Sequence, residues 1–232
     1  MPQTSILMCV RNGQNYLAEA IESVLCQTDQ DFEFIVVDDG SSDGTADILK
    51  RYRQTVSVVS VAASEGIGLA RNRGVAASSG SLVVFFDHDD LLLPDSIAVR
   101  RELLERSPEA EAAEGLADEF IAEGFEQALA DEGVSPRSGV AGSLAALMVR
   151  RSAFDRIGPF EDLPSGAGIN WLMRARSNRL AVVKTDRVLF RRRLHGSNDS
   201  RRVAINDRLR FEAIRRLRGS RGVGGSPSSS SG

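Results

Sequence analysis

Three carboxylates and one imidazole occupy four consecutive positions of this chain. Asp87, His88, Asp89 and Asp90 follow directly on the apolar run 83–86. Carboxylates this close repel one another and are unfavourable beside a buried strand, so the cluster favours a bound cation. Oxygen ligands suit Mg²⁺ or Mn²⁺, and such ions keep coordination positions open for substrate phosphates. The alternative interpretation is a solvated acidic turn.

The first hundred residues predict the scaffold that positions this cluster. Apolar runs of strand-favouring residues alternate with segments of helical periodicity. Such alternation predicts an α/β fold, a Rossmann-like, mostly parallel sheet with helices on both faces. The expected strands are 5–10, 34–37, 56–61 and 82–86, and the expected helices are 16–25, 45–53, 66–78 and 94–106.

In a sheet of this kind, ligands bind beyond the carboxyl ends of the strands. Three polar segments lie at the predicted ends of neighbouring strands, namely 10–12, 38–39 and 87–90. We therefore expect these segments to share one cleft.

The pattern is weaker after residue 106. Residues 107–138 are acidic and rich in Ala and Gly, which predicts a helical or irregular connection. A basic helix is expected over 201–218, and the Gly/Ser-rich tail 219–232 has a composition typical of disorder. The remaining expected elements are strands at 140–149, 180–184 and 188–194 and helices at 152–157 and 169–178.

Composition narrows the function classes. With 232 residues, 42% of them hydrophobic, the chain can bury a sizeable core as one domain or one domain with a small appendage. A net charge of −3 argues against general affinity for nucleic acid. No apolar run approaches the roughly 20 residues that span a bilayer, and no signal peptide is recognisable, so we expect a soluble, cytoplasmic protein. The arginines of 201–218 leave open a peripheral membrane contact, and Cys9 and Cys26 are expected in the core.

Two stretches of the chain resemble bacterial family 2 glycosyltransferases, which have the GT-A fold. The stretches are SILMCVRNGQNYLAEAIESVLCQTDQDFEFIVVDDGSSDGTADIL and GIGLARNRGVAASSGSLVVFFDHDDLLLPD. The resemblance is specific because several elements occur in the expected order, among them VVDDGSSDGT, ARNRG and the Asp-x-Asp motif. It implies a nucleotide-sugar-binding half over 1–106 and an acceptor-side half of the same domain over 107–218, where MVRRSAFDRIGPFED and FRRRLHGSNDS are similar to bacterial members.

The resemblance implies a metal-dependent, inverting glycosyltransferase of the hexosyltransferase type. Its donor would be a nucleotide-diphosphate sugar, with a UDP-sugar expected, and its acceptor a saccharide, a lipid-linked molecule or a protein. The implied nucleotide-binding residues are Val10, Asn12, Asp39, Arg71 and Asp87, of which Asp39 matches the position that contacts the base. The implied ligands of Mn²⁺ or Mg²⁺ are Asp89, Asp90, Asp87 and His195.

The general base of the family pattern is missing. Family members supply it from a Glu-Asp pair just before a helix, where this chain has Ala167 and Gly168. Loss of a general base reduces a rate by about 10²–10⁴. Glu161 or Asp162 could replace it from the preceding loop. Alternatively, the protein is a catalytically impaired pseudo-glycosyltransferase that binds a nucleotide or a partner, or the acceptor is a phosphate oxygen or thiol that needs little base assistance.

Overall fold

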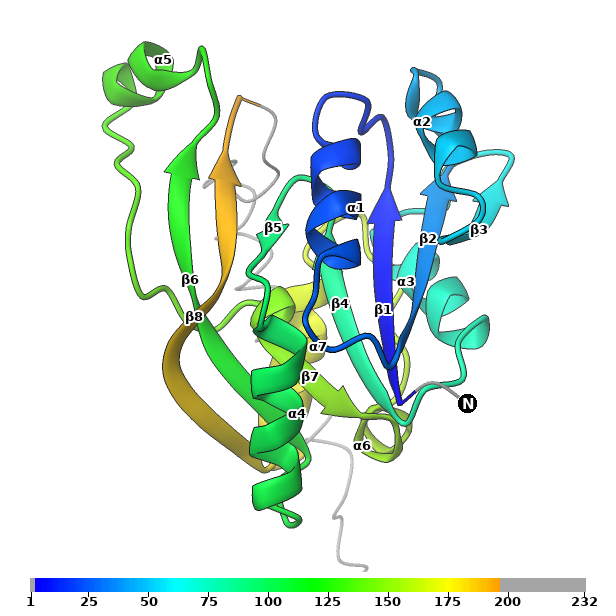
Figure 1. Ribbon diagram of the computed structural model, residues 1–232, viewed down its shortest axis with the longest axis vertical. Helices are drawn as coiled ribbons and strands as arrows, with labels where there is room; N and C mark the ends of the chain where they lie inside the picture. The colour runs from blue at the N-terminus through cyan, green and yellow to red at the C-terminus, as the bar shows by residue number, and fades with distance from the viewer. Residues whose placement is uncertain (1–2, 197–232) are drawn as a thin grey trace, which may run out of the picture. The chain divides into compact units, whose positions relative to one another are not determined.

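Four neighbouring strands form a parallel part of one sheet in the computed structural model, which describes residues 3–196 (Figure 1). β1 is buried along its whole length and pairs in parallel with both β2 and β4, and β2 pairs with β3. The predicted parallel α/β architecture is confirmed. The strands are β1 (Thr4–Val10), β2 (Phe32–Asp39), β3 (Ser57–Val61) and β4 (Leu82–Asp87).

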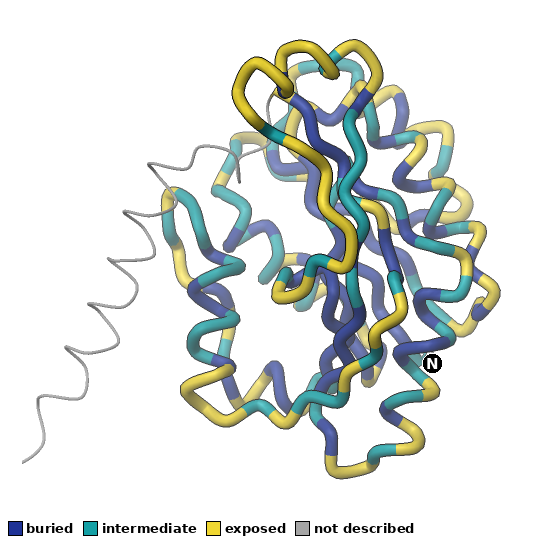
Figure 2. The backbone as a smooth tube through the Cα atoms, turned by 90° about the vertical axis from the view of Figure 1, so that its left-hand side faces the viewer, coloured by how far each residue is buried: buried dark blue, intermediate teal, exposed yellow. Residues whose placement is uncertain are grey.

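Helices cover both faces of this sheet, and alternate residues of β1 contact different helices. Ile6 and Met8 pack in one core with residues of α1, α2 and α4, while Leu7 packs in a second core with α3, α6 and α7. The central strands β1 and β4 are accordingly almost fully buried, and buried backbone gathers in the middle of the trace in Figure 2, whereas β3 is mostly exposed. The helices are α1 (Leu17–Leu25), α2 (Thr45–Arg51), α3 (Ile67–Ala76), α4 (Ser96–Arg106), α6 (Arg151–Ile157) and α7 (Ala167–Ser177).

The prediction of a helical or irregular connection over 107–138 is wrong. This segment contains β6 (Ala112–Ile121), followed by the short helix α5 (Glu126–Asp131). Two of the acidic residues of β6 form ion pairs with distant residues. Glu114 lies 2.7 Å from Lys184, and Glu119 binds Arg137 and Arg192.

Two further strand predictions need correction. The segment 140–149 contains only β7 (Leu147–Arg150), preceded by the 3-10 helix η1 (Leu144–Ala146), and the two strands expected over 180–194 form one strand, β8 (Val182–Leu194). With the short β5 (Leu91–Leu92), the sheet order is β3-β2-β1-β4-β7-β6-β8-β5. β8 keeps pairing with β6 through a register shift around Leu116. Gly115 permits this because a Cβ atom there would lie 2.3 Å from Leu189 Cδ1.

The predictions for the two cysteines have different outcomes. Cys9 is buried as expected, but the prediction for Cys26 is wrong because its side chain is exposed.

Within residues 3–196, no helix has both the length and the apolar character needed to cross a membrane. The predicted basic helix 201–218 and the tail 219–232 lie outside the described residues.

Glu33 links β1 and β2 to the turn before β4, which gives stability a pH dependence. Burial raises the pKa of Glu33, but hydrogen bonds from Ser5, Ser79 and Gly80 outweigh it, so the pKa lies below the ordinary 4.5. The carboxylate therefore stabilises the fold above pH 4.5 and loses this contribution as the pH falls through the lower folded-state pKa. Glu33→Gln should lower the free energy of unfolding in urea by about 1 kcal/mol at neutral pH, and the difference should shrink near pH 3. The same change at exposed Glu109 is the control; an equal loss there, or no pH dependence, would contradict this role.

Candidate donor and metal site

The carboxyl ends of β1, β2 and β4 lie side by side, as predicted. Val10 is the register partner of Asp38 on β2, and Cys9 is the partner of Asp87 on β4. Val10 itself is buried in the core. The β1–α1 turn is tied to the β2–α2 turn because Asn12 Oδ1 accepts a hydrogen bond from the Ser42 backbone N–H at 2.8 Å. One edge of the sheet therefore holds the three polar segments.

Asp39 is buried, and its carboxylate already accepts three hydrogen bonds. Its carboxylate accepts hydrogen bonds from the Ser64 hydroxyl at 2.7 Å and from the backbone N–H groups of Glu65 and Gly66 at 2.8 and 3.1 Å. Gly66 has a positive φ of 91°, which lets this loop fold over the carboxylate. Because a carboxylate accepts about four hydrogen bonds, Asp39 keeps capacity for about one more.

Asp87 and Arg71 form an ion pair at the end of β4. Arg71 Nη2 donates to Asp87 Oδ1 at 3.0 Å, and the Arg71 side chain is only 11% exposed. The guanidinium carbon also lies 5.5 Å from the ring centroid of Phe160. The neighbouring Arg73 is instead half exposed and pairs with Glu65 on the surface. Arg71 is thus held in a fixed place beside Asp87.

Asp89 and His195 meet although 106 residues separate them in the chain. His195 Nε2 lies 3.0 Å from Asp89 Oδ2, and both side chains are largely buried. The ring of Tyr16 packs against the imidazole with centroids 4.8 Å apart. Burial raises the pKa of Asp89, but the His195 hydrogen bond and the charges of His88 and His195 outweigh it, so the pKa lies below its ordinary value.

Asp90 contacts the backbone of β8. It is buried and accepts the backbone N–H of Arg193 at 2.9 Å. Burial, reinforced by the charges of Asp89 and Asp87, raises the pKa of Asp90 well above its ordinary value. Arg193 in turn donates to the Asp89 carbonyl at 2.9 Å and pairs with Glu19 of α1 at 2.6 Å.

Within residues 3–196, no three His, Cys, Asp or Glu side chains converge into a ready-made metal site. The Asp89–His195 pair nevertheless fits a divalent cation. Two ligands at about 2.1 Å in adjacent octahedral positions are about 3 Å apart, which matches the 3.0 Å between Asp89 Oδ2 and His195 Nε2. Mg²⁺ sites commonly use one or two protein ligands and take the rest from substrate phosphates and water.

Of the two candidate bases, Glu161 contacts residues of α7. Glu161 is exposed, and its carboxylate lies 3.7 Å from Arg174 Nε and 3.5 Å from Asn170 Nδ2, while Asp162 is exposed in the same loop. Gly168, in the first turn of α7, faces Arg71 instead, because a Cβ atom there would lie 3.2 Å from Arg71 Nη1.

Asn72 holds the loop before α7 onto α3, a function that the sequence analysis missed. Its side-chain amide donates to the Phe160 carbonyl at 2.9 Å and accepts the Phe160 backbone N–H at 2.9 Å. This two-bond contact joins residues 88 positions apart and places the Phe160 ring against Arg71. Its place inside ARNRG, between two arginines, is the only sequence signal for it.

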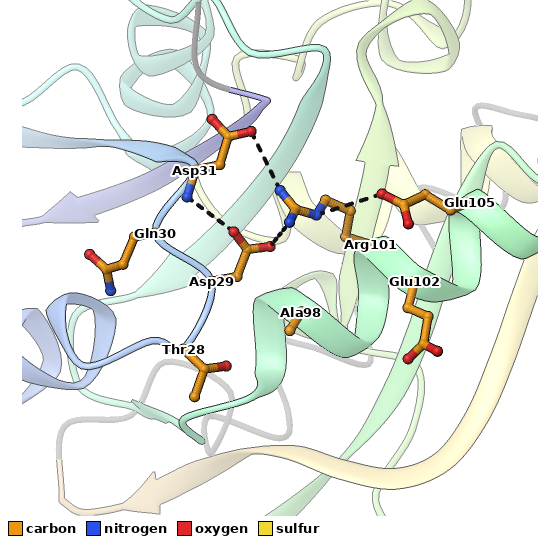
Figure 3. Close-up of a pocket in the computed structure, with 8 residues that line it drawn as sticks. All are labelled: Thr28, Asp29, Gln30, Asp31, Ala98, Arg101, Glu102 and Glu105. Atoms are coloured by element: carbon orange, nitrogen blue, oxygen red, sulfur yellow. Dashed lines mark hydrogen bonds and ion pairs between the residues drawn. The ribbon is translucent and has the colours of Figure 1, made fainter.

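A separate charged depression lies at the other end of the sheet, near the start of β2 (Figure 3). Arg101 of α4 projects into it and pairs with Asp29 at 2.7 Å and with Asp31 at 3.5 Å. These contacts join α4 to the segment before β2. The depression is remote from the strand ends that carry Asp39 and Asp87.

The family model described as glycosyl transferase family 2 matches residues 5–129, which is more than half of the chain. This chain belongs to glycosyl transferase family 2. Two relatives from Bacillus subtilis are EpsH, named as a glycosyltransferase, which is 36% identical over 96 residues, and TuaG, named as a teichuronic acid biosynthesis glycosyltransferase, which is 34% identical over 110 residues. These matches cover 40% and 46% of this chain but only 28% of EpsH and 44% of TuaG.

Two solved structures show that this family 2 chain has the GT-A fold. S. aureus TarS 1-349 in complex with UDP-GlcNAc aligns with a TM-score of 0.69 at 19% identity, covering 84% of this chain and 60% of that chain. The mannosyltransferase PcManGT from Pyrobaculum calidifontis, in complex with GDP-Man and Mn²⁺, aligns with a TM-score of 0.64 at 18% identity, covering 85% of this chain and 58% of that chain.

Removing the Asn72 amide should destabilise the family 2 domain. Asn72→Ala leaves the backbone N–H and C=O of Phe160 without these partners, so the free energy of unfolding in urea should fall by about 1–3 kcal/mol. The control is Arg73→Ala at the adjacent exposed position, which should change it by less than about 1 kcal/mol. Equal effects of the two variants would show that the Phe160 contact has no special role.

Proposed function

We propose that this chain transfers a sugar from a nucleotide-diphosphate donor, a UDP-sugar in the first instance, with inversion at the anomeric carbon. The observation that carries the proposal is the meeting of Asp89 and His195 at the carboxyl edge of a parallel sheet, beside the Arg71–Asp87 pair. Membership of glycosyl transferase family 2 and the UDP-GlcNAc and GDP-Man complexes of its structural neighbours support this assignment.

The donor would lie across the ends of β1, β2 and β4. Asp39 has acceptor capacity for a ring N–H of the base, since the loop at Ser64–Gly66 uses three of its hydrogen bonds. Asn12 and Val10 would line the base pocket. Asp87, with one oxygen held by Arg71, would contact the ribose, while Arg71 orients the diphosphate.

Asp89 and His195 would hold Mn²⁺ or Mg²⁺. A divalent cation there would stabilise the negative charge that develops on the leaving diphosphate. Asp90 faces β8 and would act by positioning Arg193 and the following His195 rather than as a direct ligand. Inversion follows if the acceptor oxygen attacks the anomeric carbon from the side opposite the diphosphate.

Loss of the Asp89 charge should weaken metal-dependent donor binding. For Asp89→Asn, calorimetry with UDP and Mn²⁺ should show an affinity at least about tenfold lower than that of the unmodified chain. Asp95→Asn, which removes a carboxylate paired with Arg187 outside the site, is the matched control and should leave UDP affinity unchanged. If UDP affinity depends neither on Mn²⁺ nor on the Asp89→Asn substitution, the proposed metal site is refuted.

Turnover distinguishes a transferase from a binding protein of the same fold. The chain should release UDP from at least one common UDP-sugar when Mn²⁺ is present, measured by coupled detection of UDP. Tight Mn²⁺-dependent UDP binding without release from any sugar nucleotide, GDP-sugars included, would instead identify a pseudo-glycosyltransferase.

A further inference from the structure

We infer that Tyr16 is a positioning residue for the proposed metal ligand His195, and that its aromatic ring holds the imidazole in the orientation that a cation needs. This inference rests on the proposed function, because it gives Tyr16 a role at the proposed metal site. It brings into that site a residue that directly precedes α1.

The orientation of the His195 imidazole is not fixed by its own side chain. The χ2 torsion of a histidine is broad, so neighbouring groups decide where Nε2 points. In this structure Nε2 lies 3.0 Å from Asp89 Oδ2. A ring nitrogen that ligates a cation has neither an N–H nor a lone pair left for a hydrogen bond to Asp89. When both side chains bind a cation, other contacts must therefore keep the imidazole in place.

Two aromatic rings pack against this buried imidazole. The centroid of the Tyr16 ring lies 4.8 Å from that of His195, and the Phe125 ring makes an edge contact at 6.4 Å. Favourable aromatic pairs have centroids about 4.5–7 Å apart, so both contacts can restrain the imidazole. The Tyr16 ring is the nearer of the two, and we therefore assign the positioning role to it.

Tyr16 is itself held in place by its backbone and by a charge. Its N–H donates to the Gly13 carbonyl at 3.1 Å, and its carbonyl accepts the Ala20 N–H at 3.1 Å, which ties it to the first turn of α1. The Arg193 guanidinium carbon lies 4.7 Å from the Tyr16 ring centroid, within the range of a cation–π contact. Arg193 also pairs with Glu19 of α1 at 2.6 Å. A ring fixed in this way can restrain His195.

The test compares Tyr16→Phe, which keeps the ring, with Tyr16→Leu, which removes it. Mn²⁺ is titrated into each protein with UDP present, and the EPR signal of free Mn²⁺ is followed against a protein-free blank. Tyr16→Leu should lower the Mn²⁺ affinity about three- to tenfold, as expected for loss of an aromatic pair, and Tyr16→Phe should leave it within about twofold. The control is Tyr52→Leu, at a tyrosine of α2 that bonds to Glu22, which should leave the Mn²⁺ affinity unchanged.

Two further readouts separate positioning from a general packing role. The affinity for UDP in EDTA should be equal in Tyr16→Leu and the unmodified chain, because only a loosened fold would weaken metal-free binding as well. The chain has 2 histidines, so ¹³C-histidine NMR resolves the His195 ring directly, with His88→Gln providing the assignment. Without metal, the His195 ring signals should shift in Tyr16→Leu through loss of the tyrosine ring current, and they should not shift in Tyr52→Leu.

Several results would overturn the inference. It is wrong if Tyr16→Leu binds Mn²⁺ as tightly as the unmodified chain, if Tyr16→Phe loses as much affinity as Tyr16→Leu, or if the His195 signals stay unchanged in Tyr16→Leu. A loss of UDP affinity in EDTA as large as the loss of Mn²⁺ affinity would assign Tyr16 a packing role instead. If the unmodified chain binds no Mn²⁺ with UDP present, the proposed metal site itself is refuted, so the two failures are distinct.

Discussion

The site depends on the hydrogen bond that the backbone of β8 donates to the buried carboxyl group of Asp90. Asp90 accepts the backbone N–H of Arg193, and this fixes the end of β8 against the turn that follows β4. Arg193 then returns two contacts, to the Asp89 carbonyl and to Glu19 of α1. His195 follows two residues later, and its Nε2 lies 3.0 Å from Asp89 Oδ2. The two halves of the chain are joined at this point.

The structure of the first hundred residues could largely be predicted because their local signals agree with their tertiary environment. β1, β2 and β4 are largely buried, and each contains an uninterrupted run of four or five apolar residues, which favours a buried strand. The rule that parallel strands place their carboxyl ends at one edge then brings Asp39 near Asp87 without further information. The same rule does not predict the direction of a side chain, so the hydrogen bond between Asp39 and Ser64 could not be predicted.

The structure after residue 106 was harder to predict because its charged residues pair with distant residues. Glu114 and Glu119 make β6 look solvated, yet their partners lie on β8 and in the loop before η1. Pairing of this kind has no local sequence signal, because a glutamate in an ion pair and a glutamate in water are the same residue in the sequence. The Asn72–Phe160 contact escaped for the same reason, because it joins segments far apart in the chain.

The place of Arg71 between β4 and α7 has a thermodynamic consequence. One guanidinium pairs with Asp87 at the end of β4 and faces Gly168 in the first turn of α7, so a ligand that moves Arg71 from one side changes what the other side presents to a second ligand. Linkage then requires reciprocity: the factor by which a ligand beside Asp87 changes the affinity of a second ligand beside α7 equals the factor by which the second ligand changes the affinity of the first. The order in which two such ligands bind would follow from the sign of this single coupling free energy.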